Sequence, residues 1–208
     1  ILLSLLFILT CPGNANRKLE EEKRWYPEYS ELSLASKLLQ GLSSMMDYVV
    51  QSGRIHFFAL LILIAYVLWT RCNKKFYQLF GLIPLILSLG YRGVFRILIE
   101  SKKQAVMQDS ILFFAFKNII YIFILISMAI CIYKIFDNKG KDIKKYLPLL
   151  VYSVGTISRY IMAFSPTILA SGERTAYFWY ISICILIILI IKEKILNKEE
   201  ETWENLKE

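Results

Sequence analysis

The sequence predicts an all-α membrane protein: a polytopic transmembrane helix bundle with five complete spans, one truncated N-terminal span and an interfacial amphipathic helix. Two observations predict this class. The 208 residues are 56% hydrophobic with a mean hydropathy of +0.48, which is too apolar for a soluble domain of ordinary composition. The apolar residues also fall in long blocks instead of at amphipathic spacing, and such blocks need lipid or other helices around them.

The first apolar block, residues 1–10 (ILLSLLFILT), is about half as long as a helix that spans a bilayer. We expect it to be the end of a truncated span. The alternative is a secretory or lipoprotein signal that ends at Cys11. No basic segment precedes the block, however, and Thr10 fits poorly before a lipidated cysteine, so the truncated span is the favoured interpretation.

Residues 11–53 form an outer-face segment that contains one amphipathic helix, over about residues 33–50. Ser33 is its expected N-cap. Lys37, Gln40 and Asp47 are available for a wetter side, so we expect the helix to lie along the membrane interface or to dock on the bundle. The apolar residues that recur at helical spacing are Leu38, Leu39, Leu42, Met45, Met46, Val49 and Val50.

The transmembrane bundle is predicted over residues 54–191. Its second span contains Gly81 and Pro84, which predict a kink that neighbouring helices stabilise. Residues 92–110 carry several charges and are expected to lie at the interface. The five complete spans are expected at residues 56–69 with their flanks, 76–91, 111–136, 146–167 and 176–191.

Lys and Arg near the ends of the spans predict the orientation, because short basic loops mark the cytoplasmic face. The densely basic connections lie at residues 71–75, 134–145 and 192–198. We therefore expect a multi-pass protein of the bacterial inner or plasma membrane, with residues 192–208 as a charged cytoplasmic tail.

With that orientation, three polar segments share the outer face: residues 11–53, residues 92–110 and the turn at 165–175. Their shared location is the main indication of function, because it gathers the polar chemistry of the chain at one face of the membrane.

The net charge of +8 fits anionic lipids or phosphorylated carriers, although basic membrane loops alone produce the same value. The sequence contains no readable nucleic-acid module and no glycine-rich phosphate loop, so the expected partner is the lipid bilayer and not nucleic acid. His56 is the only histidine, which excludes a histidine-based metal cluster or triad. The four cysteines stand far apart without CxxC spacing. We expect no metal site and no cofactor from these residues; a divalent metal would need residues outside this chain.

Arg159 is the most informative single residue, because a guanidinium inside a span costs about 2.5 to 3.5 kcal/mol on insertion scales. The functional interpretation is that Arg159 binds a phosphate of a lipid-linked donor, for which its planar bidentate geometry is suited. The alternative is a snorkelling side chain or a contact between helices, because Arg159 lies less than two turns from the outer end of its span.

Arg17 is a second candidate for phosphate binding. It follows Pro12, Gly13 and Asn14, a turn sequence that would present backbone N–H groups and an arginine to an anion. A helix stop after the truncated span is the alternative, because proline and glycine serve that purpose equally well.

Three further residues are candidates on the outer face: Arg174, Glu173 and Lys117. Arg174 begins the last span behind Glu173, and the alternative to phosphate binding is an ordinary ion pair between them or a contact with a lipid headgroup. Lys117 lies near the start of its span beside Asn118, where it either joins the same site or snorkels outward.

Acid–base chemistry needs a carboxylate in a suitable pocket. The outer-face carboxylates are expected to be solvated charges, so the sequence names no catalytic residue. They are Asp47, Glu100, Asp109 and Glu173.

The run CPGNANRKLEEEKRWYPEYSELSLASKLLQG resembles the pattern "PGN..R, then W-[YF]-P, then L-S...K" of a family of uncharacterised bacterial multi-pass membrane proteins. That family is similar in layout to the GT-C glycosyltransferases, which take sugar from a polyprenyl-phosphate carrier on the outer face. The late turn FSPTILASGERTAYF resembles the outer loop between the last two spans of the family.

The resemblance covers the C-terminal half of the family. It implies that this chain supplies bundle and acceptor or carrier surface. The acidic base of GT-C enzymes normally sits in their first outer loop, and this chain contains no such loop.

Two classes of function therefore remain open. The first is a glycosyltransferase-like protein that handles polyprenyl-phosphate-linked sugars for cell-envelope polysaccharide. The second is a transporter or flippase, indicated by the charged residues inside spans and the Gly81/Pro84 break. A scaffold without a ligand is a third possibility. The absence of an internal repeat favours the first class.

Overall fold

The structure, a computed structural model, describes residues 12–51, 54–72, 74–101, 111–137, 143–168 and 175–193. Within these ranges every regular element is a helix, so the predicted all-α class is confirmed for the described part of the chain. The predicted truncated span at residues 1–10 lies outside the described residues, as does the predicted tail after residue 193.

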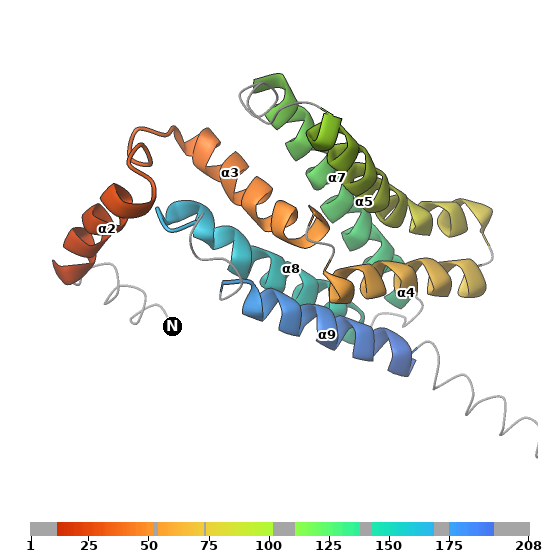
Figure 1. The fold of residues 1–208 in the computed structure, drawn as a ribbon. Helices are drawn as coiled ribbons and strands as arrows, with labels where there is room; N and C mark the ends of the chain where they lie inside the picture. The colour runs from red at the N-terminus through yellow and green to blue at the C-terminus, as the bar shows by residue number, and fades with distance from the viewer. Residues whose placement is uncertain are drawn as a thin grey trace, which may run out of the picture.

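The N-terminal part consists of helix α2 (Pro12–Trp25), helix α3 (Leu34–Met46) and the π-helix η1 (Asp47–Gln51). Ser33 caps α3 as expected, because its hydroxyl accepts a hydrogen bond from the backbone N–H of Ser36 over 3.1 Å. Helix α3 and η1 together cover Leu34–Gln51, and the interfacial, amphipathic character expected for residues 33–50 stays a prediction. Figure 1 shows α2 standing away from the other helices.

Helices α4 (Ile55–Arg71) and α5 (Lys75–Ser101) form a hairpin. The Gln78 side chain closes the turn, because its Nε2 donates to the carbonyl oxygens of Cys72 and Trp69 over 2.8 and 3.3 Å. Helix α5 continues through Pro84 and past the expected span end at residue 91. Part of the predicted interfacial segment 92–110 is therefore a continuation of α5; residues 102–110 lie outside the described residues.

The C-terminal half contains helix α7 (Ile111–Phe136), the 3-10 helix η2 (Ile143–Tyr146), helix α8 (Leu147–Tyr160), the 3-10 helix η3 (Ile161–Phe164) and helix α9 (Tyr177–Ile191). Pro148 lies in the first turn of α8, where backbone N–H groups have no partner within the helix, so the lack of an N–H in proline costs no hydrogen bond. Helices α8 and α9 lie side by side, and α3 packs against both α7 and η3 (Figure 1).

Two described helices are long and apolar enough to cross a membrane, Phe114–Phe136 and Leu147–Phe164. A third span results if Leu34–Val50 and Ile55–Arg71, which meet at an angle of 84°, are counted as one broken span. Helix α9 is apolar but shorter, with 15 residues. The structure therefore supports a helical membrane protein, and the number of five complete spans remains a prediction.

Small residues allow the helices to approach closely, as is common in membrane bundles. A Cβ atom added at Gly155 of α8 would lie 1.7 Å from the Ser182 hydroxyl oxygen of α9. A Cβ atom at Gly41 of α3 would lie 2.4 Å from the Cβ atom of Ala163 in η3. The first contact brings α8 close to α9, and the second brings α3 close to η3, which follows α8 directly.

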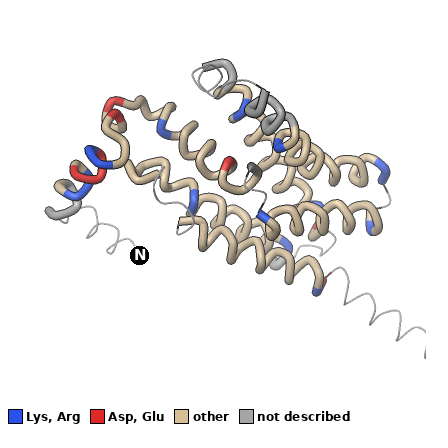
Figure 2. Tube along the Cα trace, viewed as in Figure 1, with Lys and Arg blue, Asp and Glu red and all other residues tan. Residues whose placement is uncertain are grey.

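Figure 2 shows Lys and Arg in α2 and toward the ends of the helices, separated by long uncharged stretches. Many large apolar side chains on the outside of the bundle are exposed, which in a folded chain indicates contact with lipid or another apolar surface. Among the most exposed are Ile62, Ile86, Phe123, Ile157, Phe178 and Ile188.

Candidate anion-binding site

Because successive helices run in alternating directions, one end of the bundle gathers the starts of α4, α7 and α9 with the end of α8. We name this the Arg159 end. Contacts across it join Tyr91 to Tyr121, with ring centroids 5.1 Å apart, and His56 to Tyr180, with centroids 5.8 Å apart. At the opposite end, the rings of Tyr133 and Tyr146 stack with centroids 6.3 Å apart. Among the described residues, Arg159, Lys117 and Asp47 lie at the Arg159 end, whereas Lys134 and Asp137 form an ion pair at the opposite end. The gathering of polar chemistry at one membrane face therefore stays a prediction.

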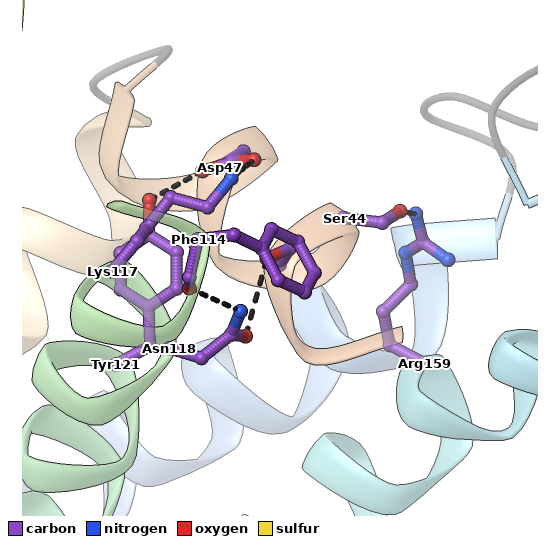
Figure 3. Close-up of polar contacts among 8 residues, drawn as sticks. Ser44, Asp47, Phe114, Lys117, Asn118, Tyr121 and Arg159 are labelled. Atoms are coloured by element: carbon purple, nitrogen blue, oxygen red, sulfur yellow. Dashed lines mark hydrogen bonds and ion pairs between the residues drawn. The ribbon is translucent and has the colours of Figure 1, made fainter. Parts of the chain in front are cut away.

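Arg159 lies in the last turn of α8 and is 3% exposed. Its Nη2 atom donates to the hydroxyl oxygen of Ser44 on α3 over 3.0 Å (Figure 3). The buried Nε and Nη1 atoms have no hydrogen-bond partner among the described residues. A buried donor without a partner costs about 1–3 kcal/mol, and more when the group is charged. Arg159 thus has buried donors that no described residue uses.

Three features of the sequence place this guanidinium. It stands in the last turn of α8, where the helix dipole favours a positive charge. Gly155, one turn earlier, lets α9 approach α8 closely. Gly41, in the second half of α3, lets that helix approach η3, and Ser44 lies one turn further along α3. Close packing of α3, α8 and α9 therefore buries the Arg159 side chain.

Two tyrosines lie close enough to Arg159 to interact with its charge, Tyr48 of η1 and Tyr180 of α9. Their rings pack against each other with centroids 6.4 Å apart. Arg54 contacts the same group, because its Nη2 donates to the Tyr48 hydroxyl over 2.6 Å and its guanidinium carbon lies 4.4 Å from the ring centroid. The hydroxyl of Tyr180 is buried without a hydrogen-bond partner among the described residues.

A second polar cluster lies one turn further along the chain from Ser44. Asp47 of η1 accepts a hydrogen bond from Lys117 Nζ over 2.8 Å and another from the hydroxyl of Tyr121. The Ser43 hydroxyl donates to Asn118 Oδ1 over 3.1 Å in the same region (Figure 3). The side chains of Lys117 and Asp47 are 12% and 30% exposed.

This second cluster changes the interpretation of two residues. Asp47 was expected on the wetter side of the amphipathic helix, but its carboxylate is bound by two side chains of α7. Lys117 does not simply snorkel outward, because its ammonium group binds that carboxylate inside the bundle. Both differences arise from the packing of α3 and η1 against α7, which the sequence alone does not indicate.

The chemistry of the Arg159 cluster is that of hydrogen-bond donation to an anion. Nε, Nη1 and the Tyr180 hydroxyl are buried donors from two helices, and no carboxylate contacts Arg159 within the described ranges. Phosphate oxygens fit a guanidinium well, because its planar fork forms charge-assisted hydrogen bonds with them. The carboxylate of Asp47 is separately engaged by Lys117.

The other predicted site residues do not join this cluster in the described structure. Arg17 donates through Nε to Glu21 over 2.8 Å, and its side chain is 73% exposed. The turn expected at Pro12 to Asn14 is wrong, because α2 begins at Pro12 and includes Asn14 and Arg17. Proline is well tolerated in the first turn of a helix, which explains this start. Glu173 and Arg174 lie outside the described residues.

Three residues of the cluster escaped the sequence analysis: Ser44, Tyr48 and Tyr180. Ser44 looks like one of several small polar residues in an amphipathic helix, and Tyr180 lies within a continuous apolar block. Nothing in either local pattern marks them. Arg159 itself was identified because a charge within an apolar span is conspicuous.

No group of three or more His, Cys, Asp or Glu side chains that could hold a metal ion occurs in the described part of the chain. Comparison with known proteins gave no match for this chain among protein-family models, curated protein sequences or solved structures.

Proposed function

We propose that this chain is part of a multi-pass membrane protein, a GT-C-like glycosyltransferase of cell-envelope polysaccharide synthesis. In this proposal Arg159 binds the phosphate of a polyprenyl-phosphate-linked sugar. The supporting observation is the guanidinium of Arg159, which is 3% exposed and keeps Nε and Nη1 without partners among the described residues. A phosphate ester supplies both the negative charge and the acceptor oxygens that this group lacks.

The alternative structural role for Arg159 is a tie between helices, which its bond to Ser44 provides. That bond uses one of five N–H donors of the guanidinium. A tie alone would be served by a glutamine, which donates hydrogen bonds without a buried charge. The unused donors therefore favour an anionic ligand over a purely structural contact.

A binding experiment tests this proposal. The full chain is placed in nanodiscs of neutral lipid, and its affinity for a polyprenyl phosphate is compared with that for the polyprenol of the same length. We expect the phosphate to bind at least about tenfold more tightly, a difference of about 1.4 kcal/mol. Arg159→Gln is expected to remove most of that preference, and Arg159→Lys part of it, because lysine keeps the charge but not the planar fork.

Arg71→Gln is the matched control, because Arg71 is an exposed arginine in the last turn of α4. It should bind both lipids as the unchanged chain does. Equal affinity of the unchanged chain for polyprenyl phosphate and polyprenol would contradict the proposal. So would an Arg159→Gln chain that keeps its fold and its preference for the phosphate.

A transporter or flippase is the second candidate, and one observation favours it. Leu34–Val50 and Ile55–Arg71 meet at 84°, and broken helices are typical of the substrate sites of transporters. The Asp47–Lys117 ion pair next to this bend is a charged pair inside the bundle, which often marks a transport pathway. Uptake or flipping of a fluorescent polyprenyl-phosphate analogue in proteoliposomes, without any change to the sugar, would favour this candidate.

We also propose a location in the bacterial inner or plasma membrane, with Arg159 toward the outer face and the C-terminus in the cytoplasm. The density of Lys and Arg at the opposite end of the bundle supports this orientation. Labelling of single cysteines introduced at Ser165 and Lys192 tests it. Ser165→Cys should react with an impermeant thiol reagent added outside the cell, and Lys192→Cys should react only after permeabilisation.

A further inference from the structure

Tyr180 is a partly buried tyrosine whose hydroxyl has an unusual environment. It lies near the start of α9, and its ring packs against the rings of Tyr48, His56 and Trp179, with centroid distances of 6.4, 5.8 and 5.7 Å. Its hydroxyl is buried but has no hydrogen-bond partner among the described residues. A buried tyrosine hydroxyl usually finds a partner, so this one needs an explanation.

Arg159 provides the second half of that explanation. Ser44, which binds its Nη2, lies one turn before Tyr48, and the ring of Tyr48 packs against that of Tyr180. Tyr180 is also close enough to interact with the charge of the guanidinium. Two neighbouring side chains, one from α8 and one from α9, therefore both have buried donors without partners among the described residues. One shared acceptor would satisfy both of them.

We infer that Tyr180 is a second ligand-binding residue of the Arg159 site, and that its hydroxyl and the Arg159 guanidinium together bind the non-bridging oxygens of a phosphate ester. This inference rests on the proposed function and assigns a residue to it that lies on a different helix. An anion is the partner that this pair favours, because no carboxylate among the described residues contacts the guanidinium and a neutral acceptor would satisfy the hydroxyl without supplying a counter-charge. A phosphate ester has enough acceptor oxygens for donors that come from two helices.

The experiment compares Tyr180→Phe with Tyr177→Phe in the full chain in nanodiscs. Tyr177 is the matched control, because it belongs to the same helix and is 61% exposed. The probes are polyprenyl phosphate, the polyprenol of the same length and inorganic phosphate. We expect Tyr180→Phe to weaken the binding of polyprenyl phosphate about tenfold, while the binding of polyprenol does not change. Tyr177→Phe should bind all three probes normally.

Stability without ligand separates a binding role from a structural one. Because the Tyr180 hydroxyl has no partner among the described residues, its removal should leave the melting temperature of the ligand-free protein unchanged or slightly raised. An unchanged or raised melting temperature together with weaker binding of polyprenyl phosphate supports the inference. A lower melting temperature with unchanged phosphate affinity overturns it, because the hydroxyl would then act only in packing.

The outcomes also separate this inference from the proposed function. If Arg159→Gln weakens the binding of polyprenyl phosphate and Tyr180→Phe does not, the inference fails and the proposed function stands. If the unchanged chain prefers neither phosphate probe to polyprenol, both fail. If inorganic phosphate binds as tightly as polyprenyl phosphate and both are weakened by Tyr180→Phe, the shared site is supported with free phosphate as its ligand, and the lipid-linked source is overturned.

Discussion

The Nη2 atom of Arg159 on α8 donates to the hydroxyl of Ser44 on α3 over 3.0 Å, across a sequence separation of 115 residues. This bond connects the buried cation to the helix that precedes the rest of the bundle. It is also the described hydrogen bond that fixes the direction of the guanidinium. Several measurable consequences come from this contact and from its neighbours.

Ser44→Ala removes the oxygen that accepts from Arg159. We expect a loss of about 1.5–3 kcal/mol in the free energy of unfolding, because the bond involves a charged donor that would be left buried. Thermal unfolding of the full chain in a mild detergent measures the change. Ser158→Ala is the control, since that hydroxyl donates only to the carbonyl of Gly155 in its own helix. Equal melting of the Ser44→Ala variant and the unchanged chain would show that the bond is not maintained in solution.

Gly155→Ala should strongly disturb the contact between α8 and α9. The added Cβ atom would lie 1.7 Å from the Ser182 hydroxyl oxygen and 2.6 Å from the Ser182 Cβ atom, so the helices have to separate. Overpacking of this kind costs about 1–3 kcal/mol or more. The melting temperature of the variant is the measurement. Ser182→Gly in the same chain should restore most of the loss, because it removes both clashing atoms.

Gly90→Ala serves as a contrast on α5. A Cβ atom at Gly90 would meet nothing within 4 Å, so the substitution gains helix propensity without a clash. We expect the same or a slightly higher melting temperature. A large loss of melting temperature in Gly90→Ala would mean that the packing around Gly155 does not explain the effect of Gly155→Ala.

Asp47 and Lys117 should show energetic coupling. Asp47→Asn or Lys117→Met alone removes one charge of the ion pair and keeps the other, whereas the double substitution removes both charges. A double-mutant cycle of unfolding free energies should give a coupling of about 0.5–3 kcal/mol. Arg17→Gln and Glu21→Gln, which form an exposed pair on α2, provide the control cycle and should give almost none. Strictly additive effects at Asp47 and Lys117 would contradict the ion pair.

Glu22 provides a pH-dependent contact between α2 and the loop that follows it. Hydrogen bonds from the side chain and the backbone N–H of Ser30 lower the pKa of its carboxyl below the ordinary value of 4.5. A carboxyl with a lowered pKa in the folded state stabilises that state above pH 4.5, and the contribution is lost as the pH falls through the lowered value. Hydrogen exchange of the Ser30 amide, corrected for the intrinsic rate, should therefore lose protection below pH 4.5. In Glu22→Gln the protection should not depend on pH in this range.

Tyr29 attaches the same loop to the end of the bundle. Its hydroxyl donates to the carbonyl of Ala163 over 2.7 Å, and its burial raises the pKa of the phenol. Tyr29→Phe should cost about 1 kcal/mol of the local stability of residues 26–33. Faster hydrogen exchange confined to that loop and η3 is the expected result. Unchanged exchange there would mean that packing alone holds the loop.

The sequence by itself determined the class of this protein and its most conspicuous charge. Long apolar blocks leave few options other than helices in a membrane, because backbone groups in lipid need partners within their own segment. The same hydropathy made Arg159 stand out, and the Ser33 cap was readable because it depends on residues only three positions apart.

The tertiary structure alone decided what surrounds Arg159. Ser44, Tyr48 and Tyr180 belong to segments far apart in the chain, and their side chains look ordinary in their local patterns. Asp47 was misjudged for the same reason, since the lysine and the tyrosine that bind it lie 70 and 74 positions away. Local periodicity reports which face of a helix is apolar, but the partner of a polar group depends on which helices pack together. Around Arg159, close approaches at Gly41 and Gly155 allow α3 to pack on η3 and α8 to pack on α9, and these contacts are visible only once the facing atoms are in place.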